Sequence, residues 1–325
     1  MANIGSTKTA EKQISALEDT ASAHVFHPLF NSPDADVILI SSDTTRYRVH
    51  SFILRNTCTY FRTLPALVQR QQQQQQQRNQ QAATSPTSPT AVSTIPPLPP
   101  LVIDVSEEDR VLTKVLSMLC GLYTEAWESI EDAEDALSLI SKWDAPGPLS
   151  VIRTAITAPL FLASPIRLYA MATTFGWDEE AQLAATRTLP LDLYDEEYKP
   201  DLERIRSKHL LRLLRLHRSR RDEFKRSLDS DEMFEAGNSP RYMCNGCGEQ
   251  LSNQTWRELK IRMFMEMDKR PAGDTLCGLD MEEWPEAVAC WEACCTKPGC
   301  GRLNYSKLET LRDIKKCVER LPTQL

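Results

Sequence analysis

Residues 36–49 read DVILISSDTTRYRV, and this stretch indicates how the chain begins to fold. Asp36–Ile40 is a β-branched apolar run, Ser41–Thr45 is polar turn material, and Arg46–Val49 alternates polar with apolar side chains. Two such runs on either side of a turn predict two short strands. A helix with one buried face is expected next. Its apolar positions are Phe52, Ile53, Tyr60, Phe61 and Leu64.

A low-complexity block then interrupts the pattern. Gln71–Gln77 is an unbroken glutamine run, and the stretch ATSPTSPTAVSTIPPLPP, which ends at Pro100, holds six prolines. Such segments lack the apolar surface that offsets conformational entropy, so residues 66–100 are predicted to be a disordered insert. A domain tolerates an insert of this kind because the entropic cost of loop closure grows only slowly with loop length.

The folded pattern resumes after the insert. Leu101–Val105 is another β-branched apolar run and predicts a strand. Ser106–Asp109 has the character of a helix start, with serine as the N-cap and acidic residues in the first turn. Proline and glycine divide the following sequence into further helical segments. These lie near residues 129–143, 147–157, 164–175 and 178–188.

A long basic helix is predicted over residues 202–229. Within it, residues 203–226 hold ten Lys or Arg against three Asp or Glu, and leucines follow one side. The part that follows is rich in cysteine and is expected to contain two helices, about 254–268 and 282–294. A last helix is expected at about 305–320.

Charge and hydropathy exclude several classes of protein. The net charge of -7 argues against a protein that coats nucleic acid and is basic throughout. The longest apolar stretches are far shorter than the about 20 residues that cross a bilayer, and the first residues do not resemble a secretory signal. We therefore expect a cytoplasmic or nuclear protein without a membrane partner, in a compartment where thiols stay reduced.

The order of strands and helices resembles a BTB/POZ domain. The motifs that carry the resemblance are PDADVIL at Pro33–Leu39, YRVH at Tyr47–His50 and, with Cys58 where serine is usual, TYF at Thr59–Phe61. Together with Leu168–Ala172, they are similar to BTB proteins that are expanded in mushroom-forming fungi. The residues that form the fold signature are Asp36, Val37, His50, Tyr60 and Phe61.

This resemblance implies an α+β fold in which a short sheet packs against a helical cluster and the first helices form a dimer face. It implies a role in protein–protein interaction, with a second copy of the chain or another protein as partner. Asp36 is then expected to accept structural hydrogen bonds, and His50 is expected to be a core imidazole bonded to the backbone. No catalytic role is implied.

Two departures from the family pattern bear on function. Ser51 stands where many members carry a basic residue beside the histidine, which argues against the charged pocket of those members. The segment after the first helix, Pro65–Gln69, lacks the apolar-x-Glu element that recruits cullin ubiquitin ligases. A role as a substrate adaptor of such a ligase therefore stays an alternative and not the first choice.

Eight of the ten cysteines fall between Cys244 and Cys317, and in a reducing compartment such a cluster indicates metal binding. Cys244 and Cys247 form a Cys-x2-Cys-Gly turn, which can supply two thiolates to one Zn²⁺. The second pair is expected from Cys295 and Cys300, which span a Pro-Gly turn. Cys294 competes with Cys295, and Cys290 is a weaker choice.

The zinc proposed for Cys244, Cys247, Cys295 and Cys300 is structural, because four thiolates leave no open position for a substrate. Ordinary buried cysteines and a redox dithiol are the alternatives. The chain lacks Gly-x-Ser-x-Gly, P-loop, dinucleotide-binding and His-Glu-x-x-His motifs. We therefore predict neither an enzyme nor a small-molecule substrate.

Nucleic-acid binding is the alternative function. The basic helix over 203–226, beside a zinc module, has the composition that phosphate backbones attract. The simpler interpretation is a solvated helix whose arginines offset acidic neighbours such as Asp192–Glu197.

The predicted organisation has four parts. Residues 1–24 form a loose arm, and 25–190 form the BTB-like domain with its helical extension. Residues 191–236 form a basic helical linker, and 237–325 form a helical region that zinc holds together.

Overall fold

The computed structural model describes residues 25–83 and 98–324. The chain forms two compact units, Met1–Ala155 and Ile156–Leu325. The first unit combines a small sheet with helices, and the regular elements of the second unit are helices. The arm predicted over 1–24 and the loop predicted over 84–97 lie outside the described residues.

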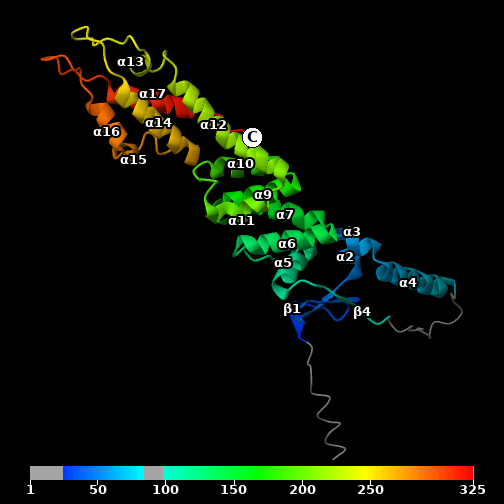
Figure 1. Cartoon of the computed structure of the whole chain (residues 1–325). Helices are drawn as coiled ribbons and strands as arrows, with labels where there is room; N and C mark the ends of the chain where they lie inside the picture. The colour runs from blue at the N-terminus through cyan, green and yellow to red at the C-terminus, as the bar shows by residue number, and fades with distance from the viewer. Residues whose placement is uncertain (1–24, 84–97, 325) are drawn as a thin grey trace, which may run out of the picture. The chain divides into compact units, whose positions relative to one another are not determined.

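A four-stranded sheet lies in the N-terminal unit (Figure 1). Its order is β1-β3-β2-β4. Strand β2 pairs antiparallel with β3 and parallel with β4, with Val37 opposite Leu101 and Ile40 opposite Asp104. Residues before and after the insert therefore belong to one sheet, and the three strands expected from the sequence are confirmed. The bounds are β1 (Phe26–Asn31), β2 (Val37–Ile40), β3 (Arg46–Val49) and β4 (Leu101–Asp104).

Strand β1 is the element of the sheet that the sequence patterns do not predict. Its sequence FHPLFN contains a proline and does not alternate, and its pairing with β3 is irregular. Proline is tolerated there because β1 is an edge strand. The strand is fixed by aromatic packing, since the rings of His27 and Phe30 lie 5.1 and 5.7 Å from the ring of Tyr47.

Two short helices, α2 (Ser51–Thr57) and α3 (Thr59–Thr63), replace the single helix expected after β3. Cys58 separates them in an extended conformation and is fully buried. The β-branched residues on either side of Cys58 have low helix propensity. The backbone N–H of Thr59 donates to the carbonyl of Asp144 (3.2 Å), which fixes the break against the end of another helix.

Three longer helices pack on one another beside the sheet: α5 (Asp109–Cys120), α6 (Ile130–Trp143) and α7 (Pro146–Ala155). Helix α5 begins at Asp109, whose backbone N–H donates to the carboxylate of Asp43 (3.2 Å). Asp43 therefore serves this helix start in place of Ser106, which the sequence predicted as the cap. Hydrogen bonds from Ser41 and from the Asp109 backbone lower the pKa of Asp43.

The tyrosine of β3 links the sheet to α5. The hydroxyl of Tyr47 bonds to the Asp109 carboxylate and lies 3.0 Å from Thr113 Oγ1. Burial and the hydrogen bond to Asp109 raise the pKa of Tyr47 well above its usual value. The completely buried Tyr47 ring thus carries its polar end to the first turn of the helix that covers the sheet.

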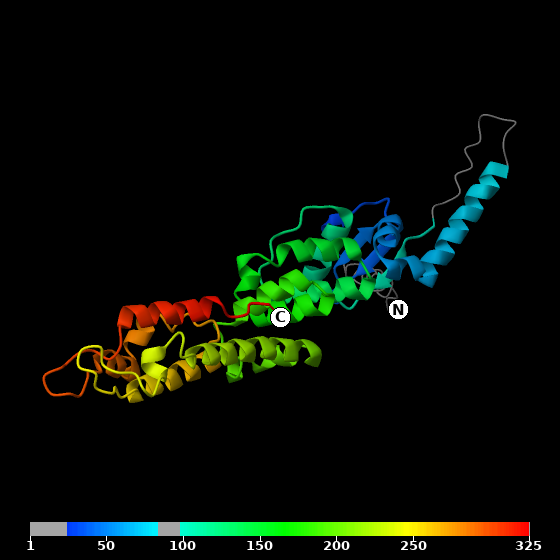
Figure 2. The same cartoon turned by 90° about the horizontal axis from the view of Figure 1, so that it is seen from above.

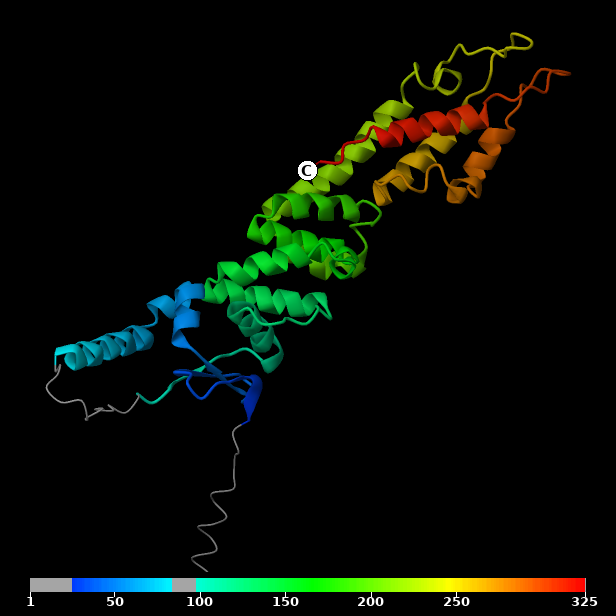
Figure 3. The ribbon, with the colours of Figure 1, turned by 180° about the vertical axis from the view of Figure 1, so that it is seen from behind.

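The first part of the predicted disordered insert is helical. Helix α4 spans Pro65–Ala83 and projects from the rest of its unit (Figure 3). Leu67 anchors its first turn in the core, and Arg70 donates to the carbonyls of Pro99 (2.6 Å) and Leu98 (3.2 Å). Glutamine and alanine are good helix formers, so an anchored start extends into the glutamine run.

The C-terminal unit is built around the long helix α12 (Ser207–Leu228). Helix α12 packs against α14 and α17, and α14 packs against α16 (Figure 2). Before α12 stand α8 (Pro159–Leu162), α9 (Pro165–Phe175), α10 (Asp178–Thr188), the 3-10 turn η1 (Glu196–Tyr198) and α11 (Lys199–Glu203). After it stand α13 (Glu235–Asn238), α14 (Gln254–Lys269), α15 (Leu279–Glu282), α16 (Pro285–Glu292) and α17 (Lys307–Glu319).

The boundary between the units differs from the predicted one. Helices α9, α10 and α11 pack together, so residues 156–190 group with the C-terminal unit and not with the sheet. The long helix expected over 202–229 is also divided, because α11 ends at Glu203 and α12 starts at Ser207. Within the described part of the chain, none of the helices is both long and apolar enough to span a bilayer.

A buried arginine fixes α12 to the end of the chain. Arg220 is 4% exposed and its guanidinium donates to carbonyls of Pro271 (2.7 Å), Ala272 (3.3 Å) and Pro322 (2.7 Å). Helix α12 also contributes to an apolar core that it shares with α14, α16 and α17. This core includes Phe224, Trp256, Met263, Cys290 and Ile314.

Candidate metal centre and interaction surfaces

The first cysteine pair lies on a tight hairpin before α14. Met243 and Gln250 form an antiparallel bridge, and the N–H of Cys244 donates to the carbonyl of Glu249 (2.7 Å). The N–H of Gly248 returns to the carbonyl of Cys244 (2.9 Å). Gly248 has a φ of +68°, which glycine adopts at little cost, so the Cys-x2-Cys-Gly spacing closes the turn.

The second pair lies on a matching hairpin after α16. Cys294 and Leu303 form its bridge, and the N–H of Cys295 donates to the carbonyl of Arg302 (2.8 Å). The N–H of Cys300 donates to the carbonyl of Lys297 (3.1 Å), which closes the turn around the Pro-Gly step. The two hairpins extend from the same end of the unit (Figures 1 and 2).

Four sulfur atoms meet between the two hairpins. The Sγ atoms of Cys244, Cys247, Cys295 and Cys300 all lie within 4.8 Å of one another. Cys244 is 3.6 Å from Cys300, and Cys247 is 3.5 Å from Cys295. A disulfide needs about 2.05 Å, whereas a tetrahedron with metal–sulfur bonds of about 2.3 Å has edges of about 3.8 Å. The spacing therefore suits four thiolates around one metal ion.

The hairpin distinguishes Cys295 from its neighbour. Cys294 is exposed and donates to the carbonyl of Glu292 (3.1 Å), outside the cluster. Successive side chains of an extended strand point to opposite sides, so only one of the two can face the first hairpin. Cys290 is not one of the four clustered cysteines. It is completely buried in the core, and burial raises its pKa to about 12.

The backbone of the first hairpin favours a thiolate. Hydrogen bonds from the N–H groups of Gly246 and Cys247 lower the pKa of Cys244 to about 6. A thiolate is the form of cysteine that binds a metal. The turn thus favours a thiolate at Cys244, whereas burial and the neighbouring thiols raise the pKa of Cys247 and raise the pKa of Cys295 to about 12.

The residues of the family-like motifs have mainly structural positions. Both carboxylate oxygens of Asp36 accept from Ser51, one from its N–H (2.7 Å) and one from its hydroxyl (2.7 Å), as a structural acceptor would. Ser51 therefore links the first residue of α2 to Asp36, directly before β2. Val37 and Phe61 are fully buried.

His50 differs from the prediction. It is partly buried at the start of α2, and its ring makes no hydrogen bond to any described residue, so it is not the expected imidazole bonded to the backbone. Only the backbone of His50 takes part in the helix start: its carbonyl accepts from the N–H of Ile53 (3.0 Å).

Large apolar side chains are exposed on the first helices. Phe52 on α2 is 72% exposed, and Tyr60 on α3 is 40% exposed. An apolar side chain that folding leaves in water costs free energy that association can recover. We call these two exposed positions the α2–α3 surface.

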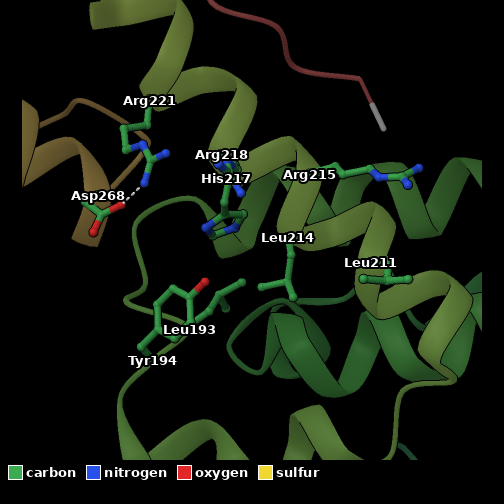
Figure 4. A pocket seen from close by; sticks show the side chains of 9 residues that line it. All are labelled: Leu193, Tyr194, Leu211, Leu214, Arg215, His217, Arg218, Arg221 and Asp268. Carbon is green, nitrogen blue, oxygen red and sulfur yellow. Dashed lines mark hydrogen bonds and ion pairs between the residues drawn. The ribbon is translucent and has the colours of Figure 1, made fainter.

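A second surface follows α12. Leu193, Tyr194, Leu211, Leu214 and Arg215 are among the residues around a hollow of about 510 Å³. Leu214 points toward Leu193 and Tyr194, while Arg221 bonds to Asp268 at one end (Figure 4). No sequence pattern predicts this hollow, because Tyr194 comes from a loop with no periodicity.

His217 forms the inner wall of this hollow. The hydroxyl of Thr188 donates to the carbonyl of Ala185 (2.7 Å) and lies 2.9 Å from Nε2 of His217. Because the hydroxyl hydrogen is used in the bond to Ala185, the Thr188 oxygen accepts from the N–H at Nε2. His217 is therefore a neutral imidazole with its hydrogen on Nε2. Burial, with the nearby charge of Arg220, lowers the pKa of His217 to about 4.

Comparison with protein-family models and with curated proteins gives no relative for this chain. No protein-family model matches it. The curated proteins also contain no match. A function must therefore be inferred from the arrangement of the side chains.

Proposed function

We propose that this chain is a protein-assembly adaptor. Its N-terminal unit associates with a second copy of itself through the α2–α3 surface, in the manner of BTB/POZ domains. Its C-terminal unit is held together by a structural zinc ion and provides a further binding surface. The role involves no catalytic step.

The exposure of Phe52 is the observation that carries this proposal. A phenylalanine that is 72% exposed stands on a helix whose other side is anchored in the unit by the fully buried Leu54. Burying most of such a ring contributes about 1.5–3 kcal/mol. In the family that the N-terminal motifs resemble, the first helices form the dimer face, so Phe52 stands where a self-association contact is expected.

The sheet provides the second support for the proposal. Short strands from both sides of the insert pair with each other, and α2, α3, α5 and α6 gather beside them. A short sheet against a helical cluster is the fold that the resemblance implies. The insert leaves this arrangement in place, because the described ends of the insert are fixed by Leu67 and Arg70.

The four sulfur atoms support the zinc part of the proposal. Zn²⁺ accepts four thiolates in a closed tetrahedron, and such sites stabilise a fold and do not catalyse. The ligands come from two hairpins that are separated by α14, α15 and α16, so one ion would fix both ends of the cysteine-rich segment. Metal binding and folding are coupled in sites of this kind.

Co-purification tests the assembly role. Two full-length copies with different tags are expressed together, and one tag is used for capture. Wild-type copies are expected to be captured together, and Phe52→Asp in both copies is expected to abolish this. Val102→Asp is a matched control, because Val102 is 52% exposed and lies on the edge strand β4, not on α2 or α3. If the Phe52→Asp copies are still captured together, the two copies do not associate through the α2–α3 surface.

A further inference from the structure

The positive charges of α12 are neutralised over only half of the helix. In its C-terminal half, Arg218 and Arg221 pair with Asp222, Lys225 pairs with Asp229, and Arg226 pairs with Glu223. In its N-terminal half, Lys208, Arg212 and Arg215 form no ion pair with any residue that the structure describes. The first turn of the helix also contains no acidic residue.

The acidic segment before α12 does not offset these charges. Asp192 accepts from the N–H of Tyr194 (3.0 Å), and Asp195 accepts from the N–H of Glu197 (3.1 Å). Glu196 pairs with Lys199 (3.7 Å). These carboxylates therefore serve their own loop, and the interpretation that they neutralise the arginines of α12 does not hold for its N-terminal half.

The effect of the unpaired cations extends to a neighbouring imidazole. Burial lowers the pKa of His209, and the charges of Lys208 and Arg212 lower it further, while Asp178 acts in the opposite direction. The N-terminal end of a helix adds positive potential of its own. The local field at this end of α12 is thus positive in a chain whose net charge is -7.

The same helix face is also apolar and hollowed. Leu211 is 53% exposed between the cations. On one side of it lies the hollow with Tyr194, and on the other side lies a hollow of about 740 Å³ that Lys208, Arg212 and Gln324 help to line. Both hollows are lined by Leu211 and Arg215, so a ligand on this face would touch leucine and cations together.

This combination fits an acidic peptide better than a nucleic acid. A phosphate backbone needs cations in a row and, for single strands, aromatic side chains for the bases. Here an exposed leucine stands among the cations, and Tyr194 is the one Phe, Tyr or Trp among the residues that line the two hollows. A leucine side chain makes no favourable contact with a phosphate. It can instead pack against an apolar side chain of a peptide whose carboxylates contact the cations.

We propose that the α12 basic face, formed by Lys208, Leu211, Arg212 and Arg215, binds an acidic segment of a partner protein that presents an apolar side chain. The partner's carboxylates lie against the three cations, and its apolar side chain covers Leu211. The inference deepens the proposed assembly role by naming the partner's chemistry. It does not depend on the α2–α3 surface, which belongs to the other unit.

Fluorescence anisotropy of the full-length chain tests this proposal. The probe is a labelled peptide in which leucine alternates with glutamate, and the comparison peptide has alanine in place of leucine. The leucine peptide is expected to bind more tightly than the alanine peptide. Lys208→Glu with Arg215→Glu is expected to weaken binding about tenfold, because each exposed charge contact is modest. Leu211→Ala is expected to weaken the leucine peptide about threefold and the alanine peptide hardly at all.

The controls separate the possible outcomes. Lys225→Glu with Arg226→Glu makes the same change of charge in the paired half of α12, and these positions are exposed. This variant is expected to bind like the wild type. Equal binding of both peptides, equal losses in the two double variants, or tighter binding of a single-stranded oligothymidylate would each overturn the proposal. Phe52→Asp is expected to leave peptide binding unchanged, so a failure of self-association is distinguished from a failure of this surface.

Discussion

Two adjacent cysteines, Cys294 and Cys295, have different environments because of a single hairpin. Cys295 faces the sulfur atoms of the other hairpin, and Cys294 faces solvent. The sequence left a choice between them, since spacing along the chain does not say which side of a strand faces inward. The β-bridge between Cys294 and Leu303 decides it, because it sets the direction of both side chains.

Cys295→Ser is therefore expected to abolish zinc binding, and Cys294→Ser is expected to preserve it. Structural zinc contributes on the order of 10 kcal/mol to the folding of small sites, so the Cys295→Ser chain should also unfold at a lower temperature. Zinc content by plasma mass spectrometry and thermal unfolding by circular dichroism measure the two effects. Equal zinc content in the two variants, or none in the wild type, would contradict the proposed centre.

The single residue His217 is expected to make the free energy of unfolding depend on pH. Its folded pKa of about 4 lies below the value of about 6.5 in an unfolded chain, so the unfolded state takes up a proton first as the pH falls. The free energy of unfolding is thus expected to fall between pH 6.5 and pH 4, by up to roughly 3 kcal/mol from this group. Above pH 6.5 the group has no such effect.

His217→Gln removes this titration and keeps a donor for Thr188. Urea unfolding from pH 7 to pH 4 is expected to show a shallower decrease for the variant than for the wild type. Both chains carry the same cysteines, so the pH dependence of metal binding cancels in the comparison. Parallel curves for the two chains would show that His217 is not buried in its neutral form.

At the scale of elements, periodicity predicted most of the helices and the strands on either side of the insert. It did not predict β1, whose Pro28 and aromatic side chains make sense only against Tyr47. It also did not predict the break at Cys58, which depends on the carbonyl of Asp144 from a distant helix end. Local patterns report burial, but contacts between distant residues set the ends of elements.

The glutamine run also shows that local composition does not decide structure by itself. Composition predicted disorder, yet the start of α4 is anchored by Leu67 and Arg70, and the helix continues from this anchor. A helix of good formers needs a nucleus, and tertiary contacts supply it here. Disorder in the remaining part of the insert stays a prediction, because residues 84–97 lie outside the described residues.

Replacing residues 75–95 with a short Gly-Ser linker is expected to change the free energy of unfolding by less than about 1 kcal/mol. The anchors Leu67, Arg70 and Pro99 remain, and loop-closure entropy depends only weakly on length. Leu101→Pro is the matched disruption, because it removes the hydrogen bond from the N–H of Leu101 to the carbonyl of Asp36 (2.9 Å). Urea unfolding measures both changes. A larger loss from the linker than from Leu101→Pro would mean that the insert, and not the strand pairing, holds the two segments together.

At the scale of the whole molecule, the sequence predicted an α+β fold around a short sheet, and the structure has a small four-stranded sheet with many helices. The four candidate ligands were chosen from spacing and meet in space. The extent of the units was not predictable, because the packing of α9 to α11 assigns residues 156–190 to the second unit. The surfaces on α2–α3 and α12 also had to come from the structure, since exposure is a property of the folded chain.

If the chain assembles as proposed, its mass in solution is that of a dimer. A chain of 36.9 kDa that pairs through Phe52 should sediment as a dimer, with a mass of roughly twice that value. Phe52→Asp would place a negative charge in the interface. Burying a charge without an oppositely charged partner is costly, so the two copies should separate. The fold of each copy should be retained, because the Phe52 side chain already lies in solvent.

Sedimentation equilibrium of the full-length chain, wild type against Phe52→Asp, is the measurement that tests this most directly. We expect a dimer for the wild type at micromolar concentration and a monomer for the variant, with the same circular dichroism spectrum. A wild-type chain that stays monomeric over the whole concentration range, or a Phe52→Asp chain that remains a dimer, would contradict the account.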